Sequence, residues 1–109
     1  MLSKADRKKA AEAKWAHDEE LRFKVYARRN KLLGLWAAAE MGVTGPAAAG
    51  YAKEVVAADF EKPGEEDVFE KVRHDLDARK VSISDHLLRR KMEELLDAAK
   101  HQIQSELKP

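Results

Sequence analysis

Residues 88–103 read LRRKMEELLDAAKHQI and carry the clearest structural signal in the chain. Leu88, Met92, Leu95, Ala99 and Ile103 recur at intervals of three and four residues. This spacing places the five apolar side chains on one face of an α-helix, and charged residues fill most positions between them. The stretch therefore predicts an amphipathic helix that buries this face against other helices.

The segments before it predict two further helices. The helix that directly precedes residues 88–103 begins with three acidic residues at 65–67, whose charge suits the positive end of a helix dipole. A break follows at 80–83, where Ser82 or Ser84 can cap the next helix. The other runs from about Ala47 to Glu61 and is ended by Pro63-Gly64. Their expected inner faces are Val68, Phe69, Val72 and Leu76 in the helix that begins at 65–67, and Ala48, Tyr51, Ala52, Val55, Val56 and Phe60 in the other.

The first helix is expected to run from residue 4 to residue 41, because residues 4–33 lack glycine and proline and are rich in strong helix formers. Gly34 interrupts it, which indicates close approach by a neighbouring helix. Gly42 and Pro46 predict a C-cap followed by the first turn of the next helix. The expected buried stripe is Leu21, Val25, Leu32, Leu35 and Ala39, with Trp36 beside it. The fold class is therefore all-α, a four-helix bundle with an N-terminal helical arm extending from helix 1.

Composition limits the class of protein further. The chain has 109 residues, which suits one domain, and it has no cysteine for disulfides or thiolate metal sites. Charged residues make up 38% of it, and no apolar run is long enough to span a membrane. Because basic residues near the N-terminus are not followed by an apolar run, no secretory signal is expected. These features predict a cytoplasmic protein.

Charge is unevenly distributed along the chain. Residues 1–33 hold ten Lys or Arg against five Asp or Glu, whereas residues 53–79 hold five against nine. Such segregation is typical of a basic segment beside an acidic body.

Residues 1–20 form an arm that does not fit the core. They favour helix, yet Trp15 is their only large apolar residue after Leu2. A helix without an apolar stripe gains little by packing on its own domain. Two interpretations stay open: a solvated charged extension, or a recognition helix that buries Trp15 on a partner. We therefore divide the chain into an arm, residues 1–20, and a helical body, residues 21–109.

No apparatus for catalysis, metal binding or cofactor binding is visible. The four histidines lack metal-ligand spacing, and the glycines fit no phosphate-binding loop. Two basic clusters, Arg28-Arg29-Asn30-Lys31 and Arg89-Arg90-Lys91, could contact nucleic acid. The near-neutral net charge of +1 and the lack of a DNA-reading motif favour solvated helix faces or pairing with acids instead. We expect a protein that is not an enzyme and that binds another protein, with no cofactor, no metal and no nucleic acid.

Residues 12–38 read EAKWAHDEELRFKVYARRNKLLGLWAA. This stretch resembles the zeta subunit family of alphaproteobacterial F-type ATP synthases, often catalogued as a domain of unknown function. The resemblance continues through Tyr51-Ala52-Lys53, Ala58-Asp59-Phe60-Glu61 and Glu65-Glu66-Asp67-Val68, and covers most of residues 7–77.

The resemblance implies a four-helix fold and an inhibitor of ATP hydrolysis by the F1 sector. In that family the N-terminal arm enters the interface between the catalytic alpha and beta subunits and reaches toward gamma. Such a protein stays outside the bilayer and is held at the inner face of the plasma membrane by the ATP synthase. The contact residues implied for this chain are Leu2, Arg7, Glu12, Lys14, Trp15, His17, Asp18 and Glu19.

The arm departs from the family pattern in two places. Lys8-Lys9 stands where acid is common, and Trp15 stands where phenylalanine is usual. Two alternatives therefore stay open beside inhibition: an interaction module of the same fold without ATPase control, and a helical protein that binds nucleotide or nucleic acid.

Overall fold

We describe a computed structural model of the chain, covering residues 18–61 and 65–107. These residues form four helices: α2 (Glu19–Glu40), α3 (Gly45–Glu61), α4 (Glu65–Ala78) and α5 (Asp85–Leu107). The all-α, four-helix prediction is confirmed. No helix within the described ranges combines the length and the apolar character that crossing a membrane requires.

The helix ends follow the chemistry of a few residues. Gly42 and Gly45 have φ of 74° and 62°, in the left-handed region that glycine adopts without steric cost. Pro46 then lies in the first turn of α3, as expected. Of the two serines considered as caps, Ser84 accepts a hydrogen bond from the Leu87 N–H at 3.1 Å at the start of α5.

At its other end, the first helix differs from the prediction. The backbone of Asp18 is extended, with φ of −101° and ψ of 104°, so a helix does not continue through it. The unbroken helix expected from residue 4 is therefore wrong at this point. The described helix begins at Glu19, because Asp18 caps it.

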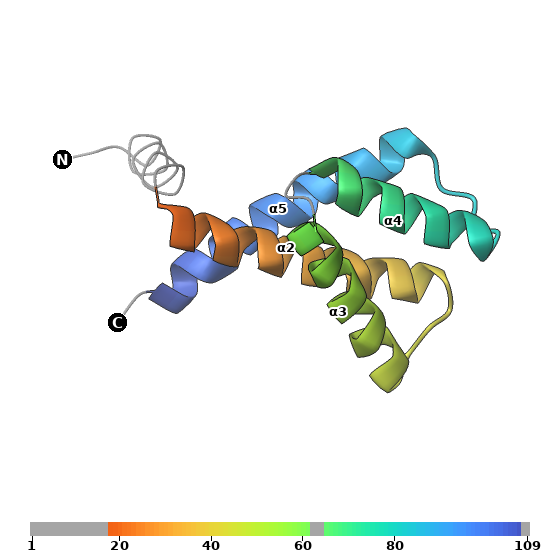
Figure 1. Ribbon diagram of the computed structural model, residues 1–109, viewed down its shortest axis with the longest axis horizontal. Helices are drawn as coiled ribbons and strands as arrows, with labels where there is room; N and C mark the ends of the chain where they lie inside the picture. The colour runs from red at the N-terminus through yellow and green to blue at the C-terminus, as the bar shows by residue number, and fades with distance from the viewer. Residues whose placement is uncertain (1–17, 62–64, 108–109) are drawn as a thin grey trace.

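The two long helices, α2 and α5, cross one another, and α3 and α4 lie over one end of the pair (Figure 1). The beginning of α2 and the end of α5 project together at the opposite end. The molecule is accordingly elongated, 52 Å long and 26 by 25 Å across.

The main core lies where all four helices meet. It combines the second half of α2, α3, α4 and the first half of α5. The predicted stripe of α4 is buried, as are Leu88 and Met92 of α5. The main core consists of Leu33, Ala37, Ala38, Tyr51, Val55, Val68, Phe69, Val72, Leu76, Ile83, Leu88 and Met92.

A second, smaller cluster lies between α2 and α5 alone. Its buried residues are Val25, Ala99 and Ile103, and the half-buried Leu21, Leu32 and Leu96 pack against them. We call this part of the molecule, residues 19–32 with residues 96–107, the two-helix extension.

Gly34 lies at the contact between α2 and α3. A Cβ atom added there would be 2.6 Å from the Cα of Ala52, closer than side chains pack. The close approach that the sequence predicted at this glycine is confirmed.

Several predicted core positions are corrected. Leu35 and Ala39, which were expected in the buried stripe of α2, are exposed, whereas Arg29 and Asn30 of the same helix are buried. Leu95 is only partly buried against the main core. The α2 stripe was misjudged because the helix packs against α3 and α5 on different faces, so its buried positions do not follow one line. The side chain of Phe60 lies outside what the structure describes.

Candidate functional site

Two of the eight predicted contact residues, Asp18 and Glu19, lie in the described part of the chain. The Asp18 Oδ1 atom accepts a hydrogen bond from the backbone N–H of Leu21 at 3.0 Å. This satisfies one of the amide groups left open at a helix start. Glu19 and Glu20 follow in the first turn, where their charge suits the helix dipole. Asp18 therefore fixes where the helical body begins.

The other six predicted contacts lie outside the described residues. They are Leu2, Arg7, Glu12, Lys14, Trp15 and His17. Their role in binding stays a prediction.

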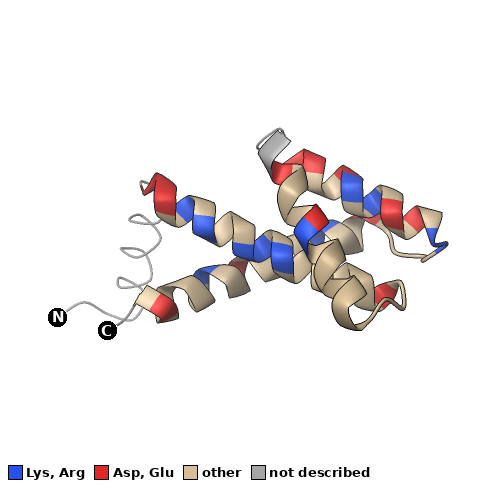
Figure 2. Ribbon diagram, turned by 60° about the horizontal axis from the view of Figure 1, so that its bottom comes forward, with Lys and Arg blue, Asp and Glu red and all other residues tan. Residues whose placement is uncertain are grey.

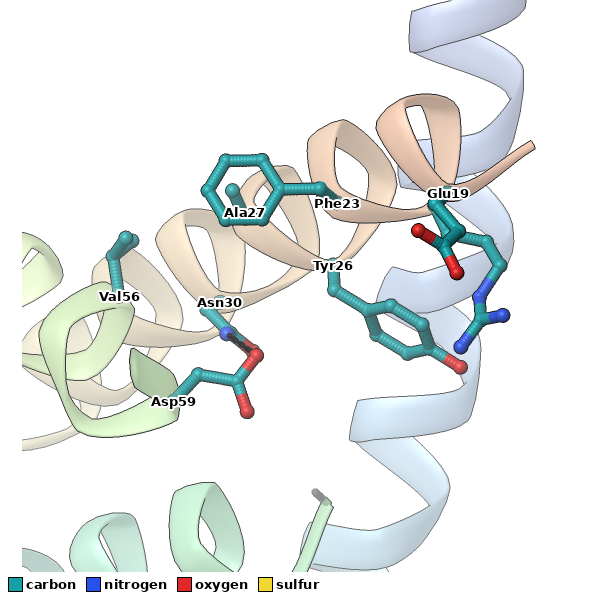
Figure 3. A pocket seen from close by; sticks show the side chains of 8 residues that line it. Glu19, Phe23, Tyr26, Ala27, Asn30, Val56 and Asp59 are labelled. Atoms are coloured by element: carbon teal, nitrogen blue, oxygen red, sulfur yellow. Dashed lines mark hydrogen bonds between the residues drawn. The ribbon is translucent and has the colours of Figure 1, made fainter. Parts of the chain in front are cut away.

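A pocket opens beside Glu19, between α2 and the last turns of α3 (Figure 3). Its volume is about 310 Å³. Residues of α2 that share one face contribute most of the lining, and α3 closes it. The lining residues are Glu19, Arg22, Phe23, Tyr26, Ala27, Asn30, Val56 and Asp59.

A polar cluster that includes the buried Arg29 and Asn30 adjoins this pocket, which Asn30 and Asp59 line. The Arg29 Nε–H donates to the Asn30 Oδ1 at 2.7 Å, and the Asn30 Nδ2–H donates to the Asp59 Oδ2 at 3.1 Å. The guanidinium of Arg29 also lies over the Tyr26 ring, 5.3 Å from its centroid. These contacts tie α2 to α3 with polar groups in place of apolar ones.

Burial shapes the electrostatics of this cluster. Arg29 is only 2% exposed. Loss of solvation lowers the pKa of its guanidinium, and the negative charges of Asp59 and Glu65 act in the opposite direction. Because a buried charge is costly without compensation, the negative charges of these acids offset part of the cost of burying Arg29.

A second pocket of about 350 Å³ lies on the α5 side of Tyr26. It shares Arg22, Tyr26 and Asp59 with the first pocket and adds Glu65 and Glu93. Both signs of charge therefore surround an aromatic ring, an arrangement suited to binding a polar segment of a partner. In residues 18–61 and 65–107, no group of three or more His, Asp or Glu side chains is placed to hold a metal ion.

Sequence inspection did not single out this site. Phe23, Tyr26, Ala27 and Asn30 recur at intervals of three, one and three, a helical spacing that could have been noticed. Nothing in the sequence indicates that Asp59 would meet Asn30, since the two are 29 positions apart.

The residues of the first basic cluster, 28–31, differ in what they contact. Arg28 donates to Gln102 at 2.8 Å and to Glu106 at 2.7 Å, so it joins α2 to α5. Its neighbours Arg29 and Asn30 are buried, which corrects the solvated helix face expected for them.

In the second cluster, Arg89 pairs with Glu66 at 2.9 Å and lies 3.8 Å from the centroid of the Phe69 ring. Lys91 pairs with Glu94 at 3.1 Å. Pairing with acids, one of the expected alternatives, is confirmed for Arg28, Arg89 and Lys91.

Comparison with known proteins gives one family and a solved structure. The family described as ATPase inhibitor subunit zeta matches residues 1–102. A structure determined in solution by NMR is 48% identical, with a TM-score of 0.70, and the alignment covers 80% of this chain and 99% of that one. No curated protein matches the chain.

Proposed function

Because the chain belongs to the ATPase inhibitor subunit zeta family, we propose that it inhibits ATP hydrolysis by the F1 sector of an ATP synthase. The arm, residues 1–20, is the inhibitory element, and the helical body, residues 21–109, carries it. One observation carries the proposal: the family match begins at residue 1, so it includes the arm as well as the body.

The arm inhibits by occupying space. It enters the interface between the catalytic alpha and beta subunits and reaches toward gamma, so this interface cannot complete the opening and closing that rotation requires. No reacting group is needed, which agrees with a family of regulatory subunits. The contacts we propose are Leu2, Arg7, Glu12, Lys14, Trp15, His17, Asp18 and Glu19.

Trp15 is the proposed anchor. A large aromatic ring that fills a desolvated pocket is a common hot spot, and truncating one typically costs about 2 kcal/mol or more of binding free energy. Residues 1–17 also hold five Lys or Arg against two Asp or Glu. A positive balance of this kind mainly raises the association rate with an acidic surface.

The junction at Asp18 supports a division of labour between arm and body. Asp18 caps the start of α2, so residues 1–17 precede this helix, and residues 18–20 of the arm form its cap and the beginning of its first turn. Removing residues 1–17 therefore leaves the cap and all four described helices in place.

The decisive experiment measures ATP hydrolysis by F1 from the same organism at increasing concentrations of the chain. Full-length protein should inhibit, and the variant lacking residues 1–17 should not. Circular dichroism and a thermal melt check that the shortened chain still folds.

Trp15→Ala tests the anchor within the intact chain. We expect inhibitory affinity to fall by about 2 kcal/mol or more, which is roughly a thirtyfold change. Leu87→Ala is the matched control, because Leu87 is an exposed apolar residue at the start of α5. If the shortened chain inhibits as well as the full chain, the assignment of inhibition to the arm is wrong.

The alternative function is an interaction module without ATPase control. Lys8, Lys9 and Trp15, where the arm departs from the family pattern, are what favour it. An F1 pull-down distinguishes it from inhibition: binding to F1 without any loss of hydrolysis would establish the alternative.

A further inference from the structure

An apolar groove follows one side of the contact between α2 and α3. Its volume is about 520 Å³. Ala49, Val56 and Ala57 of α3 line it together with Leu35 of α2, which is 38% exposed. Ala52 and two cations, Lys31 from α2 and Lys53 from α3, complete the lining.

The groove is continuous with the pocket beside Glu19. Val56 lines both, and Phe23 and Ala27 carry the apolar surface toward the start of α2. Phe23, Ala27, Lys31 and Leu35 are each four residues apart, so they follow one line along α2 for about 18 Å. This length accommodates about three turns of a second helix.

The outer surface of α3 allows a close approach. Charged residues are sparse on α3 and frequent on α2 and α4 (Figure 2). Small side chains let helix axes come within roughly 8–10 Å of each other. An incoming helix could therefore contact the alanines of α3 directly.

The charges of the groove indicate the chemistry of its occupant. Neither Lys31 nor Lys53 forms an ion pair with any of the side chains that the structure describes, and both are exposed. Asp59, which lines the adjoining pocket, accepts a hydrogen bond from Asn30. A helix with an apolar stripe and acidic residues on its flanks would match both the apolar lining of the groove and the ammonium groups of Lys31 and Lys53.

Other occupants fit the charge less well. A second copy of this chain in a two-fold dimer would bring the same lysines against each other. Residues 1–17 carry a positive balance, so their charge opposes that of Lys31 and Lys53.

We propose that this groove docks an acid-flanked amphipathic helix of the ATPase. The inference rests on the proposed function, because the pocket that adjoins this groove is lined by Glu19, at the end of the arm and next to the Asp18 cap. A partner that holds the arm therefore lies close to this surface, where one of its helices can contact Phe23 and Leu35. The body then adds a second contact to the one made by the arm, which lengthens the time that the inhibitor stays bound to the ATPase.

Photo-crosslinking in the complex tests this contact. Full-length chain carrying p-benzoylphenylalanine at position 35 is mixed with F1 from the same organism and irradiated. We expect an adduct with one F1 subunit, and mass spectrometry should map it to an acid-flanked amphipathic helix. The same photoreactive residue at position 87, another exposed leucine, should give no such adduct.

Charge reversal gives a second readout. Lys31→Glu with Lys53→Glu should remove the adduct and raise the concentration for half inhibition roughly tenfold, with weaker salt dependence than the unmodified chain. Arg79→Glu with Arg90→Glu changes the net charge equally at exposed sites outside the groove and should leave both readouts unchanged.

The outcomes distinguish failure of the groove contact from failure of the proposed inhibitory function. Inhibition without an adduct at position 35, and with unchanged potency of the lysine variant, overturns the groove contact alone. An adduct equal to that from position 87, or one on a helix without acids, overturns it too. An adduct without inhibition keeps the groove contact and rejects the inhibitory function, whereas absence of both rejects both.

Discussion

The main core and the two-helix extension are held together in different ways. The main core encloses large side chains such as Leu33, Leu76 and Met92 on all sides, because four helices meet there. The apolar cluster of the extension has only Val25, Ala99 and Ile103 as its buried members, because two helices cannot surround more. Paired α-helices at the edge of a domain thus depend on the core for most of their stability.

The extension compensates with polar contacts. Arg28 reaches across to Gln102 and Glu106, and exposed pairs of this kind contribute less than about 1 kcal/mol each. Local opening should therefore require less free energy here than in the main core. This is also the end of the molecule at which the arm joins, so opening of the extension would change how the arm is presented.

The largest effect should come from Met92→Ala in the main core. Met92 is fully buried, and truncating such a side chain removes apolar contacts and leaves a cavity. We expect the free energy of unfolding to fall by about 2–5 kcal/mol. Urea denaturation followed by circular dichroism measures it. Leu87→Ala, at an exposed site, should change stability by less than about 0.5 kcal/mol; similar losses from both would contradict the assigned core.

Gly34→Ala should have the next largest effect. Its new Cβ would lie 2.6 Å from the Cα of Ala52, and backbone cannot move aside as a flexible side chain can. We expect a loss near the upper end of the range for overpacking, about 3 kcal/mol.

Gly50→Ala is the matched control for this glycine. A Cβ at Gly50 meets no atom within 4 Å, so the better helix propensity of alanine should stabilise α3 by about 0.5–1 kcal/mol. If both variants destabilise the protein equally, α2 and α3 do not cross at Gly34.

Ile103→Ala tests the extension directly. We expect a loss of about 2 kcal/mol, the lower end for a buried isoleucine, because neighbours on two helices can close around the gap. Amide hydrogen exchange should accelerate over residues 96–107 and stay unchanged in α4. Uniform acceleration through all four helices would show that the extension opens only together with the main core.

The sequence predicts the number of helices and most of their boundaries. Helices α4 and α5 each bury one face against the main core, so the stripes ending in Leu76 and beginning at Leu88 follow a simple period. In α2 the prediction held at Val25 and Gly34 but was wrong at Leu35 and Ala39. The interfaces of this helix also use Arg29, Asn30 and small alanines, which hydrophobic periodicity does not mark.

The candidate pocket was beyond prediction for a similar reason. It depends on Asp59 of α3 meeting Asn30 of α2, a tertiary contact that no local pattern specifies. The arm was predictable only as a segment lacking an apolar stripe. Its family resemblance, not its periodicity, indicated what it binds.

The smallest effect is expected at Asp18, which the sequence suggested as a partner contact and the structure places as the cap of α2. Asp18→Ala removes the acceptor for the Leu21 N–H, so the first turn of α2 should lose about 1 kcal/mol of local stability. Hydrogen exchange at residues 20–23 measures this loss.

Asp18→Asn separates capping from partner binding, because asparagine caps a helix about as well as aspartate but carries no charge. If Asp18 acts through the cap, inhibition of F1 should survive Asp18→Asn and weaken in Asp18→Ala, since a frayed first turn no longer fixes where the arm begins. Equal loss of inhibition in both variants, with normal exchange at residues 20–23 in Asp18→Asn, would instead make the Asp18 carboxylate a direct contact with the ATPase.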